Sequence, residues 1–327
     1  MENAAVYEGH ARFTASHTVE VRDAILEADK IFINVGARAT IPPVEGIGTV
    51  PYLTNSGMMD IDVLPEHLVI VGGGYIALEF GQMYRRFGSK VTIVQRSSRL
   101  LSKEDADVST AVQEILENEG IQVCTNTSDL SVRNESGRIA VRLKCNDEAM
   151  EVAGSHLLVA AGRTPNTDDL GLDSAAIETD PRDFIQVDDQ LRTKVEGVWA
   201  LGECNGQGAF THTAYNDFEI VAANLLDGDQ RRVSDRIFAF GLFIDPPLGR
   251  VGLTEEEVLA SGRKALKATR PMTRVGRAVE KGETQGFMKV LVDAETRQIL
   301  GASILGVGGT KSSTISSTSC TSRLPTR

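Results

Sequence analysis

The sequence predicts an α/β fold that ends in a smaller α+β unit. The first observation is the run "LVIVGGGYIALEFGQMYRRFGSKVTIVQ" at 68–95, where an apolar strand, a glycine-rich turn, a helix and a second strand follow one another. The second is "GVWALGECNGQGAFTHTAYNDFEIVAANLLDG" at 197–228, which again gives a strand, a glycine-rich turn and a helix. Strands that alternate with helices indicate a parallel sheet.

The segments ahead of the first glycine-rich turn consist of strands. Residues 4–22 alternate apolar and polar side chains, which predicts a small antiparallel meander. Residues 31–35 form an apolar strand that closes on Gly36 and enters a Pro-Pro loop, so we expect no helix after it.

Two helices are predicted between 68 and 124. Helical spacing gives each of them one apolar face, made of Ile76, Phe80, Met83 and Phe87 in the first and of Val108, Val112, Ile115 and Leu116 in the second. Short strands at about 130–152 predict a meander. Near the C-terminal end, "FAFGLFIDPPLGRVGLTEEEVLASG" and "GFMKVLVDAETRQILGASILG" predict a strand, a helix and a β-hairpin, which form the separate α+β unit.

Charge and composition exclude several classes of function. The 327-residue chain carries 45 acidic and 34 basic residues, a net charge of -11, and no run rich in Lys or Arg. We therefore expect neither nucleic acid nor a membrane as a partner. No stretch has the pattern of a signal peptide or the length of an apolar span, which predicts a cytoplasmic protein.

The four cysteines, Cys124, Cys145, Cys204 and Cys320, stand far apart in the sequence. They form no C-x-x-C or C-x4-C pair, and no histidine stands at metal-ligand spacing from them. In a cytoplasmic chain this pattern predicts isolated reduced thiols and no metal site.

The turn after residue 71 has the spacing of a dinucleotide-binding motif. Gly72, Gly74 and Ala77 match G-x-G-x-x-A between a strand and a helix. The first glycine permits the tight turn, the second lets a pyrophosphate approach the backbone, and the small third residue lets helix and strand pack closely. We therefore expect the pyrophosphate to contact the start of the helix, at Gly72, Gly73, Gly74, Tyr75, Ile76 and Ala77.

The end of the second strand indicates which nicotinamide nucleotide is bound. An NAD site usually places a carboxylate there, but this sequence has Gln95, Arg96 and Arg99. Arginines can bind a 2′-phosphate through paired hydrogen bonds, whereas a carboxylate would repel it. These residues favour NADPH over NADH, although exposed arginines in a loop are also common solubilising residues.

Four motifs together resemble the flavin-dependent pyridine nucleotide-disulfide oxidoreductases, the family of glutathione reductase, dihydrolipoamide dehydrogenase and mercuric reductase. They are "GGGYIALEFG", "GRTPNT", "TKVEGVWALGE" and "DPPLGRVGLTEEEV", in the family's order. The sequence resembles the mercuric-reductase-like branch most, and it is also similar to the dihydrolipoamide-dehydrogenase-like branch. The resemblance implies two Rossmann-like FAD/NAD(P)-binding domains, the first incomplete, plus the start of an α+β interface domain.

The resemblance also implies domain boundaries. Residues 1–51 and 164–235 would form the partial FAD-binding domain, 52–163 the NAD(P)-binding domain, and 236–309 the partial dimerisation domain. Residues 310–327, "TKSSTISSTSCTSRLPTR", have the composition of a disordered tail. We also hypothesise that this tail is a frameshift product, because shifting the frame by one base can turn its serine codons into codons for apolar residues.

Residue roles are implied in the same way. Tyr75 resembles the tyrosine that covers the nicotinamide pocket, and Glu79 the glutamate beside the flavin, so both are candidate catalytic residues. FAD is expected to contact a set made of glycines, one carboxylate and a helix start, namely Gly36, Gly162, Gly202, Glu203, Phe210, Thr211, His212 and Thr213. Judged by pattern alone, 210–213 is equally an N-cap, with His212 at the surface.

The implied reaction passes a hydride from NAD(P)H to FAD and then electrons to a small-molecule, metal-ion or disulfide acceptor. The family is homodimeric. Its redox cysteines, C-terminal His-Glu pair and FAD-pyrophosphate motif are missing from this sequence, so we expect a truncated and impaired enzyme. The alternative is a non-catalytic remnant that binds NADPH.

Overall fold

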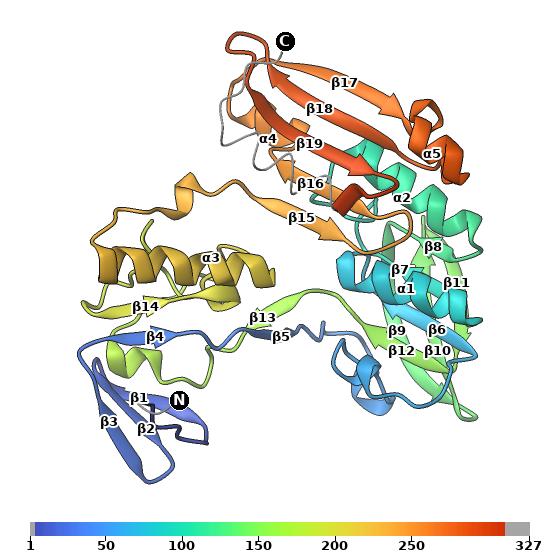
Figure 1. The fold of residues 1–327 in the computed structure, drawn as a ribbon. Helices are drawn as coiled ribbons and strands as arrows, with labels where there is room; N and C mark the ends of the chain where they lie inside the picture. Colours follow the sequence, from blue (N-terminus) through green and yellow to red (C-terminus); the bar gives the residue numbers. More distant parts are fainter. Residues whose placement is uncertain (1–3, 311–327) are drawn as a thin grey trace. The chain divides into compact units, whose positions relative to one another are not determined.

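The computed structural model describes residues 4–310. The chain forms two compact units, each built from two separate segments (Figure 1). Unit 1 comprises Met1–Arg38 and Arg163–Arg236, and unit 2 comprises Ala39–Gly162 and Ile237–Arg327. The chain passes between the units in β5 (Ala37–Ala39) and β13 (Arg163–Pro165), which pair with each other.

Unit 1 starts with the predicted antiparallel meander. It runs on past residue 22, because a third strand pairs with the second, and its strands are β1 (Ala11–Ala15), β2 (Thr18–Val21) and β3 (Ala24–Glu27). The shorter β4 (Ile31–Ile33) pairs in parallel with β14 (Val198–Ala200). Although they are far apart in sequence, these two strands form the centre of the unit.

Helix α3 (Thr211–Ala222) covers one face of the β4–β14 pair. Side chains of β14 point alternately to its two faces, so Trp199 packs with Ile220 and Val221 of α3, while Val198 packs with Ile33 on the other face. Short helical turns complete the unit: η3 (Leu172–Ala175), η4 (Gly202–Asn205), η5 (Ala223–Asp227) and η6 (Val233–Asp235).

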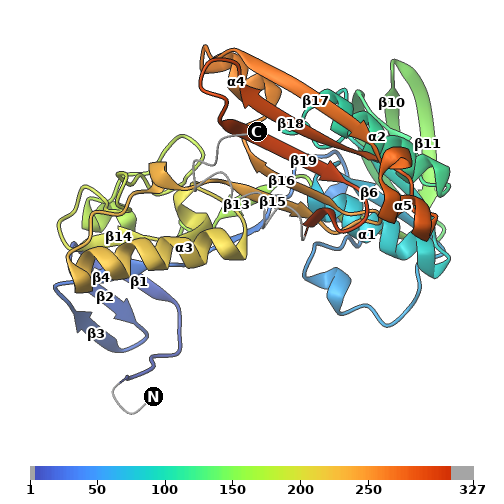
Figure 2. The same cartoon turned by 45° about the horizontal axis from the view of Figure 1, so that its top comes forward.

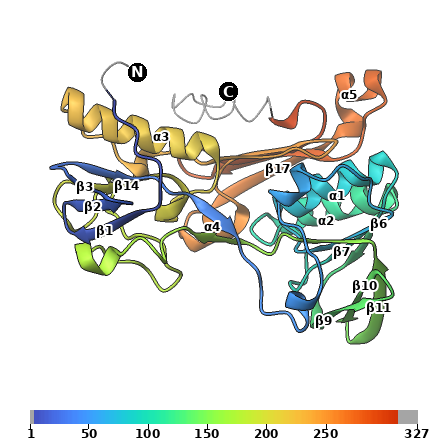
Figure 3. The same ribbon diagram turned by 90° about the horizontal axis from the view of Figure 1, so that it is seen from below.

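Unit 2 contains the predicted parallel sheet. Its strand order is β12-β6-β7-β8, and its strands are β6 (His67–Val71), β7 (Lys90–Val94), β8 (Gln122–Cys124) and β12 (His156–Val159). Helices α1 (Tyr75–Phe87) and α2 (Ala106–Asn118) lie on one face (Figure 3). The other face packs against the meander β9 (Thr127–Glu135), β10 (Arg138–Cys145) and β11 (Glu148–Gly154).

Strand β6 explains how this sheet is covered on both faces. Its residues are all buried, and they alternate between two cores. Leu68 and Ile70 pack with the helices, whereas Val69 and Val71 pack with the β9–β11 meander. A strand buried on both faces reads as an unbroken apolar run, which is what 68–71 shows in the sequence.

The predicted inner face of α1 is wrong in part. Met83 and Phe87 are 38% and 62% exposed, and the helix buries Ala77, Leu78 and Tyr84 instead. The helix backbone lies close to the sheet at Gly81, where a Cβ would stand 3.3 Å from Ile93 Cδ1. This close approach places the small residues inward. The predicted face of α2 is confirmed, since its four apolar residues are all buried.

The C-terminal part of unit 2 is a five-stranded antiparallel sheet of order β15-β16-β19-β18-β17 (Figure 2). Its strands are β15 (Ala239–Leu242), β16 (Leu248–Gly252), β17 (Ala265–Pro271), β18 (Phe287–Asp293) and β19 (Ile299–Leu305), with helices α4 (Glu255–Ala260) and α5 (Gly276–Lys281). The sequence did not predict β17 or α5. Every residue of β17 is exposed, so this edge strand carries no apolar alternation.

This sheet shares a core with the parallel sheet β12-β6-β7-β8. Leu242, Leu248 and Leu305 pack in the same apolar cluster as Leu78 and Val112.

Single helical turns also occur at η1 (Ile47–Thr49), η2 (Gly57–Met59) and η7 (Met272–Arg274). Residues 311–327 of the hypothesised tail lie outside the described range. Within residues 4–310, no helix is both long enough and apolar enough to span a membrane.

Candidate dinucleotide and flavin sites

Gly72 and Gly73 are required by the packing of the turn between β6 and α1. Gly72 has φ +124°, and a Cβ on it would lie 2.2 Å from the carbonyl oxygen of Ala160. A Cβ on Gly73 would lie 2.8 Å from Leu100 Cδ2. Any larger residue at either position would have to displace backbone or buried side chains.

Gly74 differs, because packing does not require a glycine there. It is the N-cap of α1, with φ -90° and ψ -175°, a conformation open to any residue. An added Cβ would meet no protein atom within 4 Å, and no side chain caps the helix. The turn therefore leaves space in front of the helix N-terminus, which fits a pyrophosphate group. Behind it, Ala77 is fully buried and Ile76 is half-buried.

The loop after β7 runs beside this turn. The backbone N–H of Leu101 donates to the carbonyl of Gly73 at 2.9 Å, so the loop and the turn are joined. Gln95 is half-buried, Arg96 is exposed, and Arg99 donates to the carbonyl oxygen of Ser102 at 3.2 Å. Arg96 and Arg99 thus both lie in the loop that follows β7 (Lys90–Val94) and runs beside the turn, and their assignment to a 2′-phosphate site stays a prediction.

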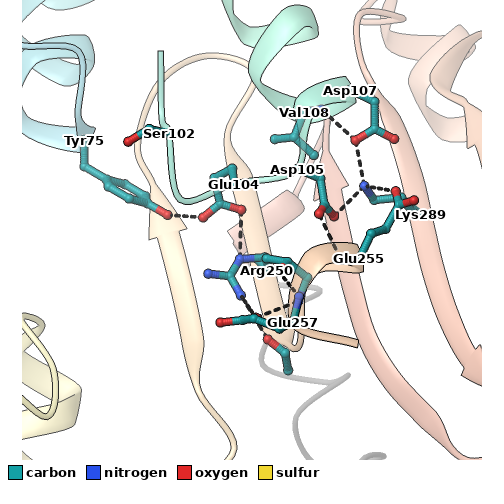
Figure 4. A network of polar contacts seen from close by, with 12 residues as sticks. Tyr75, Ser102, Glu104, Asp105, Asp107, Val108, Arg250, Glu255, Glu257 and Lys289 are labelled. Atoms are coloured by element: carbon teal, nitrogen blue, oxygen red, sulfur yellow. Dashed lines mark hydrogen bonds and ion pairs between the residues drawn. The ribbon is translucent and has the colours of Figure 1, made fainter. Parts of the chain in front are cut away.

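Tyr75 is anchored by its hydroxyl group. It donates to Glu104 Oε1 at 2.6 Å (Figure 4), and Glu104 is 2% exposed. Burial raises the pKa of Tyr75, and the Glu104 carboxylate raises it further, so the phenol keeps its proton. The sequence assigned Tyr75 to the site but gave no sign of its partner.

Glu79 lies on α1 and is half-buried. Its Oε1 accepts a hydrogen bond from the backbone N–H of Phe243 at 2.9 Å. Burial raises the pKa of Glu79, and the hydrogen bond from Phe243 opposes this change without cancelling it.

Replacing Glu79 with glutamine should stabilise the fold at pH 7 and leave it unchanged below about pH 4. A carboxyl group whose pKa is raised in the folded state holds its proton more tightly there, so its stability contribution falls as pH rises through the unfolded-state pKa. Glutamine keeps the acceptor for Phe243 but cannot ionise. Thermal melts of the wild type and E79Q at both pH values test this. Equal melting temperatures at pH 7 would contradict it.

In unit 1, Glu203 is held by Arg163. The guanidinium Nε and Nη2 atoms each lie 2.8 Å from a different carboxylate oxygen, and Nη2 also donates to the carbonyl of Ala37 at 2.6 Å. The hydrogen bonds to Glu203 raise the pKa of Arg163. A carboxylate bound in this bidentate way has a fixed orientation.

Sequence reasoning missed Asp217, which supports the Gly202–Glu203 turn. Asp217 lies on α3 and is fully buried, and its Oδ2 accepts hydrogen bonds from Gly202 N at 2.8 Å and Asn205 Nδ2 at 2.9 Å. Its other oxygen pairs with Arg236. The available signal was an acidic residue on the inner side of a helix that also carries Ile220 and Val221.

The remaining candidates have simple positions. Phe210 precedes α3 as its N-cap, and its ring stacks on His212 with centroids 5.3 Å apart. Thr211 is exposed, as is His212, and Thr213 is buried. Gly36 and Gly162 both have positive φ, at +66° and +139°.

The structure groups the candidates by unit. Tyr75, Glu79, Gln95, Arg96 and Arg99 belong to unit 2, together with the glycine-rich turn and Gly162. Gly36, Gly202, Glu203 and 210–213 belong to unit 1.

Comparison with known proteins assigns the family. The profile of the pyridine nucleotide-disulphide oxidoreductases matches residues 1–217, and the profile of their dimerisation domain matches residues 239–324. The chain belongs to this family. It is a flavin-dependent pyridine nucleotide-disulfide oxidoreductase by family, and the family implies FAD and a pyridine nucleotide as cofactors.

The most informative relatives come from bacteria. "Probable pyridine nucleotide-disulfide oxidoreductase RclA" of Escherichia coli K12 is 36% identical over 94% of this chain and 70% of its own length. A mercuric reductase of Lysinibacillus sphaericus is 33% identical over 93% of this chain and 56% of its own length. RclA is thus more similar than this mercuric reductase, which does not favour the mercuric-reductase-like branch.

A solved structure also shows the similarity to RclA. A Cu(II) complex of HOCl-induced flavoprotein disulfide reductase RclA from Escherichia coli matches 97% of this chain and 73% of its own, with a TM-score of 0.90 and 34% identity. This oxidoreductase therefore spans about three quarters of the RclA fold and little more than half of the mercuric reductase.

The oxidoreductase also contains an acidic cluster that the sequence did not indicate. Asp105, Asp107 and Glu255 gather their oxygens within 4.8 Å of one another, a geometry that suits a cation. Lys289 supplies that cation, with Nζ at 2.6, 2.6 and 2.9 Å from the three carboxylates (Figure 4). A lysine therefore fills this position from within the chain.

The prediction of isolated cysteines needs correction. Cys124, Cys145 and Cys204 are free thiols, but the sheet meander brings Cys145 next to Cys124. Burial raises the pKa of Cys124 to about 12, and the neighbouring Cys145 contributes to this rise. Cys145 on β10 pairs with Thr127 at the start of β9, only three residues after Cys124, and this pairing brings the two thiols near each other. Cys320 lies outside the described residues.

Proposed function

We propose that this oxidoreductase uses NADPH, passing a hydride from its nicotinamide to FAD and electrons on to an acceptor. The observation that carries the proposal is the open position at Gly74, the N-cap of α1, next to a loop that presents Arg96 and Arg99. In this proposal the helix start binds the pyrophosphate, and the two arginines bind the 2′-phosphate. Neutral Gln95 replaces the carboxylate of an NAD site.

The proposed FAD contacts lie in unit 1. Glu203 would accept hydrogen bonds from the ribityl hydroxyls, and Arg163 holds its carboxylate in one orientation for this task. Asp217 fixes the preceding glycine through the N–H of Gly202. The start of α3 at 210–213 would donate N–H groups to the flavin ring edge. When bound, the nicotinamide supplies a hydride and the flavin accepts it.

For the electron acceptor we propose only a chemical class, and for the assembly only an oligomeric state. The relatives are named for mercuric, dihydrolipoyl and flavoprotein disulfide reactions. We propose that the electron acceptor of this oxidoreductase belongs to one of three corresponding classes: a metal ion, a disulfide or a small oxidant. The match to the dimerisation domain supports a homodimer.

Replacing Arg96 and Arg99 with glutamine should weaken NADPH binding about 10- to 100-fold and leave NADH binding unchanged. Each arginine would contribute a charge-assisted hydrogen bond of about 1.5–3 kcal/mol to a phosphate that NADH lacks, discounted for solvent exposure. Isothermal titration calorimetry with both nucleotides measures this.

R138Q/R142Q is the matched control for this loss of two charges, because Arg138 and Arg142 are also exposed in unit 2, where they pair with Glu66 and Glu151. It should leave both affinities unchanged. Equal loss of NADH and NADPH affinity in R96Q/R99Q would contradict the assignment of a 2′-phosphate site.

The flavin part of the proposal has its own test. Purified protein with added FAD should show a bound flavin band that bleaches when NADPH is added without oxygen. A protein that binds NADPH but retains no flavin would contradict the proposed oxidoreductase activity, and would agree instead with a nucleotide-binding protein that does not turn over.

A further inference from the structure

Arg250 connects the C-terminal sheet of unit 2 to the nucleotide-binding turn. It lies on β16, is 4% exposed, and stacks over the Phe240 ring with its guanidinium carbon 4.0 Å from the ring centroid. Its Nε lies 2.8 Å from Glu104 Oε2, and its Nη1 donates to the carbonyl of Gly252 at 2.9 Å. Arg250 is therefore held in place from its own sheet while it pairs with Glu104.

Glu104 extends this connection to the start of α1. One of its oxygens pairs with Arg250 and the other accepts the Tyr75 hydroxyl at 2.6 Å (Figure 4). Because Glu104 is buried, both interactions act where water screens them little. The result is a continuous chain of polar contacts from β16 to the first residue of α1.

The backbone of the same loop contacts the turn a second time. Leu101 donates its N–H to the carbonyl of Gly73 at 2.9 Å, and Glu104 donates its N–H to the carbonyl of Leu101 at 2.7 Å. The loop thus contacts both neighbours of Gly74: its backbone binds Gly73, and its Glu104 side chain binds Tyr75. The open position in front of α1 lies between these two attachments.

The next residues of the loop are fixed by a second cation from the C-terminal sheet. Lys289 on β18 binds Asp105 and Asp107, each at 2.6 Å. Asp105 also accepts the backbone N–H of Glu255 at 2.9 Å, at the start of α4. The segment 104–107 is therefore attached to the C-terminal sheet at several points.

We infer that Glu104 and Arg250 are positioning residues for the nicotinamide nucleotide. They keep Tyr75, and with it the first turn of α1, in the orientation that binds a pyrophosphate before the nucleotide arrives. Holding a binding group in place beforehand lowers the ordering cost of binding. A hydrophobic pair would fill the same space, but it would not accept the Tyr75 hydroxyl. This inference rests on the proposed NADPH site.

The test compares NADPH affinity by calorimetry in three variants. E104L/R250M removes both charges together, so no buried charge is left unpaired, and leucine offers the Tyr75 hydroxyl no acceptor. Y75F removes only the hydroxyl. We expect a loss of about tenfold for E104L/R250M and about three- to tenfold for Y75F. Because the residues act through one chain of contacts, the triple variant should lose less than the product of the two losses.

Two controls separate positioning from general loss of stability. V258A opens a cavity in a different cluster of the C-terminal sheet, with Leu291 and Leu300, and should leave affinity within about twofold. K267M removes an exposed ion pair to Glu255 and should do the same.

The outcomes are distinct. A wild-type protein that binds no dinucleotide overturns the proposed function and this inference with it. A wild type that binds NADPH while E104L/R250M and Y75F bind it equally well overturns the inference alone, as do fully multiplicative losses in the triple variant. If E104L/R250M does not fold, Y75F decides, because it leaves the Glu104–Arg250 pair intact: a loss of affinity supports the inference and an unchanged affinity overturns it.

Discussion

Replacing Gly74 with aspartate should abolish NADPH binding while the protein stays as stable as the wild type. No protein atom lies within 4 Å of a Cβ at this position, so the side chain fits without strain. Aspartate is also a preferred N-cap residue and its charge suits the helix N-terminus, so stability should be unchanged or slightly higher. The same carboxylate would occupy the proposed pyrophosphate position and repel it, at a cost of several kcal/mol.

Calorimetry and a thermal melt of the same sample check both halves of this result. We expect at least about a 100-fold loss of NADPH affinity for G74D. G74A is the matched control, because it adds a methyl group without charge and should lose much less affinity. If G74D binds NADPH as the wild type does, the pyrophosphate does not lie at the start of α1.

Replacing Lys289 with methionine should destabilise the protein by about 3–5 kcal/mol. Lys289 is the cation shared by Asp105, Asp107 and Glu255, and its side chain is 1% exposed. Its loss would leave three carboxylates facing one another, with Asp105 buried and Asp107 and Glu255 only partly exposed to solvent. Urea unfolding measures the change. K267M is the control, since Lys267 pairs with the same Glu255 near the surface and should cost less than about 1 kcal/mol.

The pH dependence of the same cluster gives an independent check. Burial alone would lower the pKa of Lys289, but hydrogen bonds to the three carboxylates outweigh it and raise this pKa. This contribution is complete below the unfolded pKa of about 10.4 and is lost as pH rises through the higher folded value. Burial acts against ionisation of Glu255, yet Lys267 and Lys289 lower its pKa. That contribution is lost as pH falls below about 4.3 through the folded value.

In K289M the acid response should reverse. Protonation would relieve the repulsion among the three carboxylates, so the free energy of unfolding of the variant should increase as pH falls from 7 toward 5. In the wild type, the contribution of this cluster to stability should stay constant over the same pH range. A K289M variant that loses as little stability as K267M, or shows the wild-type pH profile, would contradict the assigned role of Lys289.

The sequence predicted those parts of the fold whose signal is local. The strand 68–71 and the inner face of α2 follow from runs and spacings within a few residues. The inner face of α1 could not be predicted in full, because the close approach of its backbone at Gly81 depends on Ile70 and Ile93 of the sheet. Periodicity alone does not show how closely a helix packs.

The candidate site shows the same division. The glycine-rich turn has a local spacing, so Gly72, Gly74 and Ala77 could be assigned from their order in the chain. Glu104 and Arg250 could not, because they are distant in the chain and each resembles an ordinary surface charge in the sequence. Asp217 was missed for the same reason, since its role depends on the N–H of Gly202.

The shared core of unit 2 determines how this protein can be divided or recombined. Leu248 and Leu305 complete the core that Leu78 and Val112 begin, and Lys289 neutralises carboxylates of the loop. A polypeptide shortened to residues 39–162 would expose that core and leave an acidic loop without its counter-charges. The smallest piece that keeps the glycine-rich turn together with its whole core is thus discontinuous in the gene, 39–162 joined to 237–310. Chimeras with related reductases should fold only when both segments come from the same parent.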